Sequence, residues 1–65
     1  MRTIRKLREQ HRLTQLELAI KIGVSPGSVY GWESGRTEPK VSQLRKLAQL
    51  FDVSMDDIAI EERSS

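Results

Sequence analysis

The chain has 65 residues, a formal net charge of +2 and no cysteine, so it suits one small domain and excludes disulfide bonds and thiolate metal sites. A domain of this size lies near the lower limit for a core without metal or disulfide support, and the missing cysteines fit a reducing cytoplasm. No apolar run approaches the length of a membrane span, and the first residues are basic and periodic, so we expect neither a transmembrane segment nor a signal peptide.

The charge is unevenly divided along the chain. Residues 1–50 contain ten Lys or Arg against four Glu, a net charge of +6, and residues 51–65 contain one Arg against five acids, a net charge of −4. This division is typical of a basic face that meets a polyanion, with an acidic end held away from it. An ordinary mixed surface accounts for the same charges equally well.

Residues 2–12 are predicted to form the first helix. Ile4 and Leu7 recur at helical spacing, and Leu13 closes the turn that follows. The opposite face of this helix is basic. Such a face can meet phosphates but is usually just solvated, and its cations are Arg2, Arg5, Lys6 and Arg12.

Two short helices joined by a glycine turn are predicted next. Thr14 is a good N-cap and Glu17 completes a capping box, while Gly23 ends this helix with a residue that adopts left-handed geometry at little cost. The second helix follows at once, with Ser25 as its N-cap and Pro26 at its first position. The inner faces carry Leu18, Ala19 and Ile22, then Val29, Trp32 and Glu33; the outer face of the second helix carries Gly27, Tyr30, Gly31 and Ser34.

The rest of the chain predicts a loop and two more helices. Gly35 ends the preceding helix and Pro39 fixes the exit of the loop. A clean apolar stripe then predicts a helix over about 42–51, formed by Leu44, Leu47, Ala48 and Phe51.

The last predicted element is short. Asp52 follows the preceding helix, and Ser54 is expected to cap a final helix. We therefore expect an all-α, compact five-helix domain over residues 1–60 and a short polar tail, residues 61–65.

A helix, a short turn that contains glycine and a second helix form the helix-turn-helix pattern, whose second helix enters the DNA major groove. The chain resembles the Cro/C1-type helix-turn-helix repressors, also called the XRE-like family, along nearly its whole length. No single piece is specific, but the ordered set is a strong signal. The matching residues are Leu7, Arg8, Gln15, Leu18, Ala19, Gly23, Val24, Ser25, Val29, Glu33, Gly35, Pro39, Leu44, Leu47, Ala48, Phe51, Val53, Ser54 and Ile58.

The resemblance implies a lambda-repressor-like fold in which the second helix of the motif reads DNA. The implied base-reading positions are Pro26, Gly27, Ser28, Tyr30 and Gly31. The implied phosphate contacts lie at the N-termini of the two helices and in the loop after the recognition helix: Thr14, Gln15, Ser25, Arg36, Thr37 and Lys40. For Gln15 and the loop residues, the alternative is a merely solvated position.

The base-reading positions carry few hydrogen-bonding side chains, since only Ser28 and Tyr30 offer them. One hypothesis is that Gly27 and Gly31, one turn apart, let the helix backbone approach the base edges while Pro26 packs on a thymine methyl group. Ser28 and Tyr30 would then read bases or phosphates, and Tyr30 is favoured as a contact. The alternative is that this face reads little and that DNA shape and half-site spacing supply the specificity.

The resemblance also pairs Arg8 with Glu33, and the helix periodicities point both side chains inward. We expect a largely buried, bidentate ion pair that ties the first helix to the recognition helix. A structural role for Arg8 is therefore favoured over a DNA contact.

These observations predict a cytoplasmic, nucleoid-associated transcriptional regulator that binds double-stranded DNA. Repression by a homodimer on two half-sites is favoured, because a single module of this size buries little surface. The apolar candidates for the dimer contact are Leu50, Met55, Ile58 and Ile60, although Ile58 suits the core at least as well. The alternative function is a protein-interaction module on the same fold, such as an antitoxin or an anti-repressor partner.

An enzyme is not expected. His11 is the only histidine and has no companion ligands, and no Ser/His/Asp set or paired carboxylates suited to catalysis can be recognised. The sequence therefore predicts no metal, no cofactor, no small-molecule site and no membrane partner.

Overall fold

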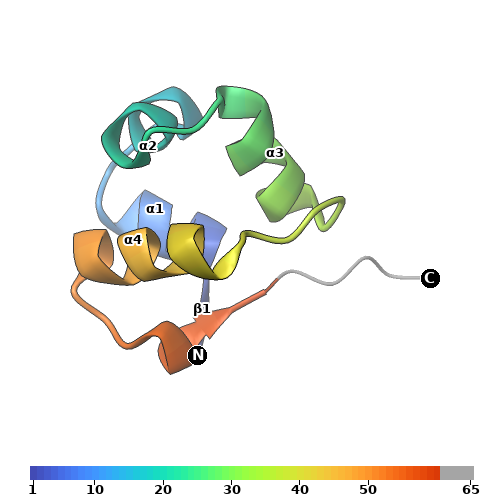
Figure 1. The fold of residues 1–65 in the computed structure, drawn as a ribbon. Helices are drawn as coiled ribbons and strands as arrows, with labels where there is room; N and C mark the ends of the chain where they lie inside the picture. Colours follow the sequence, from blue (N-terminus) through green and yellow to red (C-terminus); the bar gives the residue numbers. More distant parts are fainter. Residues whose placement is uncertain (61–65) are drawn as a thin grey trace.

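Four α-helices and one short 3-10 helix account for most of residues 1–60, the part of the chain that the computed structural model describes (Figure 1). The predicted tail, residues 61–65, lies outside the described residues. The elements, in chain order, are β1 (Arg2–Thr3), α1 (Ile4–Gln10), α2 (Gln15–Ile22), α3 (Pro26–Ser34), α4 (Val41–Phe51), η1 (Met55–Asp57) and β2 (Ile58–Ala59).

The expected fifth α-helix is instead the 3-10 helix η1. Ser54 caps it as expected, because its Oγ accepts a hydrogen bond from the backbone N–H of Asp56 at 3.2 Å. The helix cannot continue, since Ile58 is extended and pairs with Arg2 in a parallel ladder. The count of five α-helices is therefore not confirmed.

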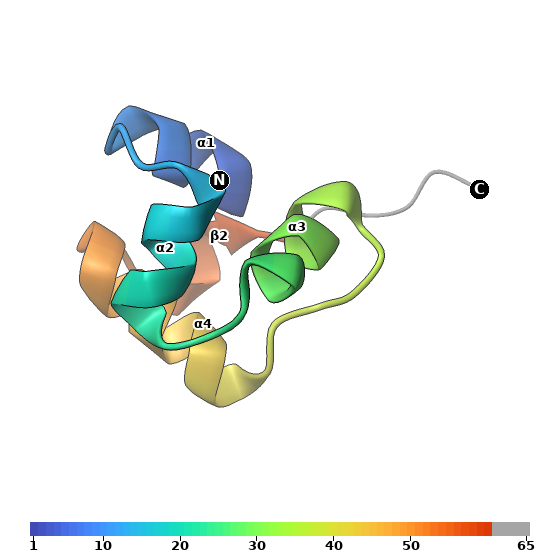
Figure 2. The same ribbon diagram turned by 90° about the horizontal axis from the view of Figure 1, so that it is seen from above.

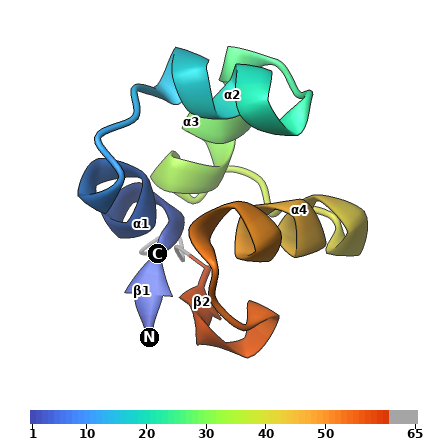
Figure 3. The ribbon, with the colours of Figure 1, turned by 90° about the vertical axis from the view of Figure 1, so that its left-hand side faces the viewer.

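The two short strands were not expected from the sequence. Arg2 lies opposite Ile58 and Thr3 lies opposite Ala59, which joins the two ends of the described chain (Figure 3). The first helix consequently starts later than predicted, at Ile4, because Thr3 belongs to β1 and caps α1: its Oγ1 accepts a hydrogen bond from Lys6 N–H at 3.1 Å.

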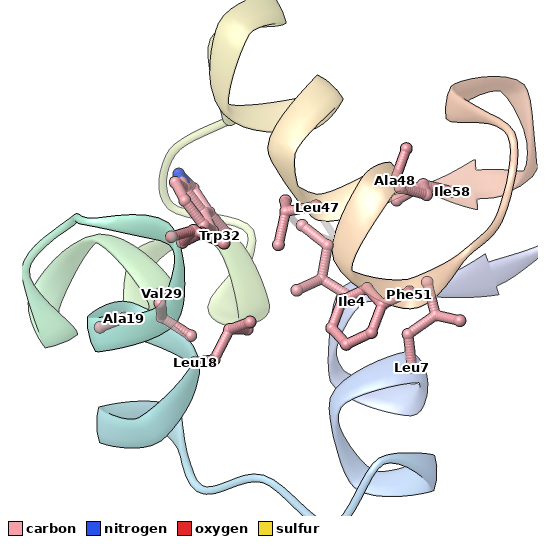
Figure 4. Close-up of a cluster of buried hydrophobic side chains, with 11 residues drawn as sticks. Ile4, Leu7, Leu18, Ala19, Val29, Trp32, Leu47, Ala48, Phe51 and Ile58 are labelled. Atoms are coloured by element: carbon pink, nitrogen blue, oxygen red, sulfur yellow. The ribbon is translucent and has the colours of Figure 1, made fainter.

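The core lies between α2 and α3 on one side and α1 and α4 on the other (Figure 4). Leu7, Leu18, Val29 and Leu47 are fully buried, one from each α-helix. Trp32 is 3% exposed and is the aromatic anchor that the periodicity of its helix predicts. The other core residues are Ile4, Ala19, Ile22, Ala48, Phe51 and Ile58.

The helices α2 and α3 pack against each other at one end of the molecule, and the paired strands lie at the opposite end (Figure 1, Figure 3). The loop of residues 35–40 runs along one side of the molecule from α3 to α4 (Figure 2). The N-termini of α2 and α3 thus lie at the end of the molecule away from β1 and β2 (Figure 1, Figure 3).

Candidate nucleic-acid interface

The turn between α2 and α3 has the geometry that its glycine predicts. Gly23 is left-handed, with φ +76°, and both its N–H and that of Val24 donate to the carbonyl of Ala19, at 2.9 and 3.0 Å. Pro26 then occupies the first turn of α3, and Ser25 Oγ accepts a hydrogen bond from Ser28 N–H at 3.2 Å. This confirms the helix-turn-helix pattern.

The outward face of α3 is exposed at Pro26, Gly27 and Tyr30, and Ser28 is half-buried. Tyr30 is 53% exposed, so its ring stands mostly in solvent. The hydroxyls of Ser25 and Ser28 lie 3.1 Å apart and share a hydrogen bond. These two hydroxyls therefore form one polar spot at the N-terminus of α3.

Gly31 is placed differently from the expectation. It is buried rather than on the outer face, and a Cβ built there would lie 2.6 Å from Oγ1 of Thr37. At Gly27, by contrast, a Cβ would meet only Ser25 Oγ, at 3.8 Å. Of the two glycines, only Gly27 is therefore exposed on this face, because the loop after α3 covers Gly31.

The loop carries two cations, and one of them, Arg36, lies beside α3. Arg36 and Lys40 are exposed, as is Thr37. The guanidinium carbon of Arg36 lies over the Tyr30 ring, 5.9 Å from its centroid. Lys40 lies at the N-cap of α4, where its backbone N–H donates to Gln43 Oε1 at 2.8 Å, and its side chain is not used in that cap.

The N-terminus of α2 carries the expected capping box. Glu17 N–H donates to Thr14 Oγ1 at 3.0 Å, and Thr14 N–H donates to Glu17 Oε1 at 2.8 Å. These hydrogen bonds hold the pKa of Glu17 below its ordinary value. The N–H groups of Gln15 and Leu16 have no acceptor within the helix, and this is the usual place for an anion to bind.

Gln15 turns part of its side chain inward, which the sequence did not predict. Its Nε2 donates a hydrogen bond to Oε1 of Glu33 at 3.0 Å, and the residue is half-buried. One N–H of the amide is thus engaged. The second N–H of the same group makes no hydrogen bond with residues 1–60.

Glu33 is the centre of the polar contacts that hold the three helices together. Arg8 donates through Nε to Oε2 at 2.6 Å and through Nη2 to Oε1 at 3.0 Å, so the expected pair is bidentate. A third donor of Arg8, Nη1, reaches the carbonyl of Leu13 at 2.8 Å. Arg5 adds a longer contact, 3.4 Å from Nε to Oε1.

Burial acts to raise the pKa of Glu33, but the hydrogen bonds from Arg8 and Gln15 and the charge of Arg8 outweigh it, so the pKa lies below its ordinary value. The same partner raises the pKa of Arg8. The carboxylate therefore stays ionised although its side chain has no exposed surface. Arg5 was not expected in this cluster; its position one turn before Arg8 is the signal that reveals it.

The acidic residues of the described chain's C-terminal part lie apart from these contacts. Asp52 follows α4, and Asp56 and Asp57 belong to η1, near the end of the molecule opposite α2 (Figure 1). The cations of the loop and the acids of η1 are thus on separate parts of the surface. This separation suits a surface that meets a polyanion with only one of its sides.

The apolar candidates for a dimer contact differ in burial. Ile58 is 4% exposed and belongs to the core, so it is not a surface residue. Leu50, Met55 and Ile60 are half-buried. More exposed apolar side chains occur on α2 and at the start of α4, namely Leu16, Ile20 and Val41.

Within residues 1–60, no group of His, Cys, Asp and Glu is placed to hold a metal ion. His11 is exposed; its Nδ1 lies 2.9 Å from the carbonyl of Leu7, and its ring centroid is 4.9 Å from that of Phe51. No helix among the described residues has the length and apolar character needed to cross a membrane.

Comparison with known proteins places the chain in a family. A family model described as helix-turn-helix matches residues 4–58. The chain is 44% identical over 55 residues to the uncharacterized HTH-type transcriptional regulator YobD of Bacillus subtilis, covering 85% of this chain and 49% of that protein. It is 40% identical over 55 residues to an uncharacterized HTH-type transcriptional regulator of Methanocaldococcus jannaschii, covering 85% and 83% of the two chains.

A third relative is the antitoxin PezA of Streptococcus pneumoniae, 36% identical over 62 residues, with 95% of this chain and 39% of that protein covered. The chain thus spans about half the length of the Bacillus relative and less of the antitoxin. No solved structure matches the chain significantly. The match over residues 4–58, the regulators among the relatives and the geometry of α2 and α3 show that the chain belongs to the Cro/C1-type helix-turn-helix family of DNA-binding transcription regulators.

Proposed function

We propose that this chain binds double-stranded DNA sequence-specifically and acts as a repressor, as a dimer on an operator with two half-sites. The observation that carries the proposal is the exposed face of α3 with Arg36 of the following loop beside it; Lys40, the second cation of that loop, is exposed at the N-cap of α4. The buried carboxylate of Glu33 fixes this helix to α1 and α2. A fixed helix with cations on the loop that follows it suits major-groove recognition.

The contacts divide into two groups. Base edges are met by the outward face of α3 at Pro26, Gly27 and Ser28, and the exposed ring of Tyr30 lies on the same face. Gly31 is buried beneath the loop and contributes indirectly, since its missing side chain lets Thr37 lie close to the helix. Phosphates are met by the N-termini of α2 and α3 and by the loop, through Thr14, Gln15, Ser25, Arg36, Thr37 and Lys40.

A dimer supplies the affinity that one module lacks. A single module of this kind buries about 600–1,000 Å² on DNA, whereas two modules about one helical turn apart double the contacts. The partly exposed apolar residues Leu50, Met55 and Ile60 are the proposed contact between the two copies. With DNA as its ligand, the protein is proposed to act in the cytoplasm, at the nucleoid.

The first experiment is selection from a random duplex library at moderate salt, followed by titration of the winning duplex and a scrambled duplex. We expect a palindromic winner that binds far better than the scramble. Equal, weak binding to both would contradict sequence-specific recognition. The spacing of the two halves of the winner gives the half-site separation directly.

A matched pair of variants tests which cations meet DNA. Arg36→Ala/Lys40→Ala and Arg45→Ala/Lys46→Ala each remove two exposed positive charges, the first from the loop beside α3 and the second from α4. The loop variant is expected to lower the slope of log affinity against log salt by up to about 1.8, at about 0.9 for each phosphate contact. Equal effects of the two variants would contradict the placement of the interface.

The same salt titration separates the proposal from a protein-interaction module on this fold. An apolar protein interface loses little affinity with salt, whereas phosphate contacts lose it steeply. The similarity to an antitoxin fits the second function without favouring it. Absence of salt-sensitive DNA binding would favour a protein partner.

A further inference from the structure

The carbonyl of Gly31 anchors the start of the loop that follows α3. Gly35 has φ +78° and turns the chain back toward the helix. The backbone N–H groups of Arg36 and Thr37 then both donate to the Gly31 carbonyl, at 2.9 and 3.2 Å, and Ser34 Oγ donates to it at 3.2 Å. The second and third residues of the loop are thus tied to the middle of the helix.

The side chain of Thr37 fills the space that a side chain at position 31 would need. A Cβ built on Gly31 would lie only 2.6 Å from Oγ1 of Thr37. This contact explains a glycine in the interior of a helix, which costs about 1 kcal/mol relative to alanine. The loop therefore packs on α3 as part of the same surface.

Tyr30 and Arg36 meet on the exposed side of this packed loop. The Arg36 guanidinium carbon is 5.9 Å from the ring centroid of Tyr30, which is within the range of a cation–π contact. The ion pairs among residues 1–60 all involve Glu33, so Arg36 makes no ion pair within 4.0 Å in this part of the chain. The residue is exposed, and none of the hydrogen bonds among these residues uses its guanidinium.

We propose that Tyr30 is a positioning residue whose ring holds the Arg36 guanidinium against α3, and that Arg36, not the Tyr30 hydroxyl, contacts DNA. The proposal rests on the proposed function. A guanidinium suits a pair of acceptors, either two phosphate oxygens or O6 and N7 of a guanine. Holding it in place on an aromatic ring lowers the entropy lost when the contact forms.

A double-mutant cycle on the selected duplex tests this relationship, with Tyr30→Phe, Tyr30→Leu, Arg36→Ala and Tyr30→Leu/Arg36→Ala. Tyr30→Phe keeps the ring, and we expect its affinity to stay within about twofold of the wild type. Tyr30→Leu removes the ring and is expected to weaken binding about two- to fivefold. In the Arg36→Ala background the same change is expected to cost nothing further.

Two further readouts identify the acceptor. If Arg36 meets a phosphate, Arg36→Ala lowers the salt slope by about 0.9 and leaves the selected sequence unchanged. If it meets a guanine, the preference at one base pair of each half-site relaxes. Tyr30→Leu is expected to lower the salt slope in the first case, or to relax the same base preference in the second, as Arg36→Ala does. A purely structural role of the ring would change neither.

The outcomes separate this inference from the proposed function. A wild-type protein that binds no duplex overturns both. Wild-type binding with additive effects of Tyr30→Leu and Arg36→Ala overturns the positioning role alone, and a loss in Tyr30→Phe as large as in Tyr30→Leu assigns the contact to the hydroxyl instead. Thermal unfolding of each variant monitors folding, and Tyr30→Gln replaces Tyr30→Leu if the latter does not fold.

Discussion

Arg8 and Glu33 form the shortest side-chain hydrogen bond between two helices among residues 1–60, 2.6 Å from Nε to Oε2, across 25 residues of sequence. The carboxylate lies on α3 and the guanidinium on α1, and Gln15 of α2 adds a third donor. Because Glu33 has no exposed side-chain surface, its buried negative charge would be unfavourable without the positive charge of Arg8 beside it. One buried carboxylate therefore sets the orientation of the recognition helix.

Arg8→Ala is expected to unfold the domain or to lower its melting temperature sharply. Removing one partner of a buried pair costs about 3–5 kcal/mol, since it leaves the other charge uncompensated. A domain of this size has a total stability of about 5 kcal/mol. Chemical denaturation followed by circular dichroism measures the loss.

Arg5→Ala is the matched control, because Arg5 touches the same carboxylate from a position that is half exposed. Its loss is expected to be at most about 1 kcal/mol. If Arg8→Ala proves as mild as Arg5→Ala, the buried pair contributes no more to the stability of the fold than a half-exposed ion pair does.

The lowered pKa of Glu33 predicts that the domain loses stability in acid. The folded state holds this proton less tightly than the unfolded state, whose carboxyl has its ordinary pKa of 4.5. The contribution is therefore complete above pH 4.5 and is lost as the pH falls through the lower pKa of the folded state. Denaturant titrations between pH 7 and pH 3 measure it.

Glu33→Gln and Glu17→Gln distinguish the source of this acid sensitivity. Both carboxyls have a lowered pKa, but Glu17 is exposed on the capping box of α2, whereas Glu33 is buried. Glu33→Gln is expected to lower stability at neutral pH and to flatten its decline in acid. Glu17→Gln is expected to keep most of that decline; the reverse pattern would place the acid-sensitive group at the cap.

The two glycines of α3 are expected to respond in opposite ways to alanine. Gly27→Ala gains up to about 1 kcal/mol of helix propensity, since its Cβ meets nothing closer than 3.8 Å. Gly31→Ala gains the same propensity but must displace Oγ1 of Thr37, so it is expected to show no gain or a net loss. Urea denaturation of both variants compares them.

Thr37→Ala provides the check on this explanation. It removes the hydroxyl that a Cβ at position 31 would meet, so Gly31→Ala should become stabilising in that background. An equal gain in stability from Gly27→Ala and Gly31→Ala in the wild-type background would show that Thr37 moves away from position 31 at no cost in free energy.

The sequence predicted the parts of this fold that local chemistry determines. The helix α2 begins after Thr14, with Glu17 in its capping box, and α3 begins after Ser25, at Pro26, as expected. Gly23 is left-handed, also as expected. The apolar periodicity likewise identified most of the core. These features depend on residues within one or two turns of each other, which a single sequence displays directly.

The features that were missed depend on contacts between distant segments. The pairing of Arg2 with Ile58 spans nearly the whole chain, and two-residue strands carry no periodicity. Gly31 was placed on the outer face because helical spacing alone could not show that Thr37 would return to cover it. The contact between Gln15 and Glu33 likewise follows from the crossing of two helices.

Asp52→Gly is expected to stabilise the domain by about 1 kcal/mol. Asp52 ends α4 in the left-handed region, with φ +56°, where a side chain is strained and a glycine is not. Its negative charge also lies at the negative end of the helix dipole. Asp52→Ala separates the two causes, because it removes the charge and keeps the strain. If Asp52→Ala stabilises as much as Asp52→Gly in denaturation experiments, the gain comes from the charge and not from the backbone.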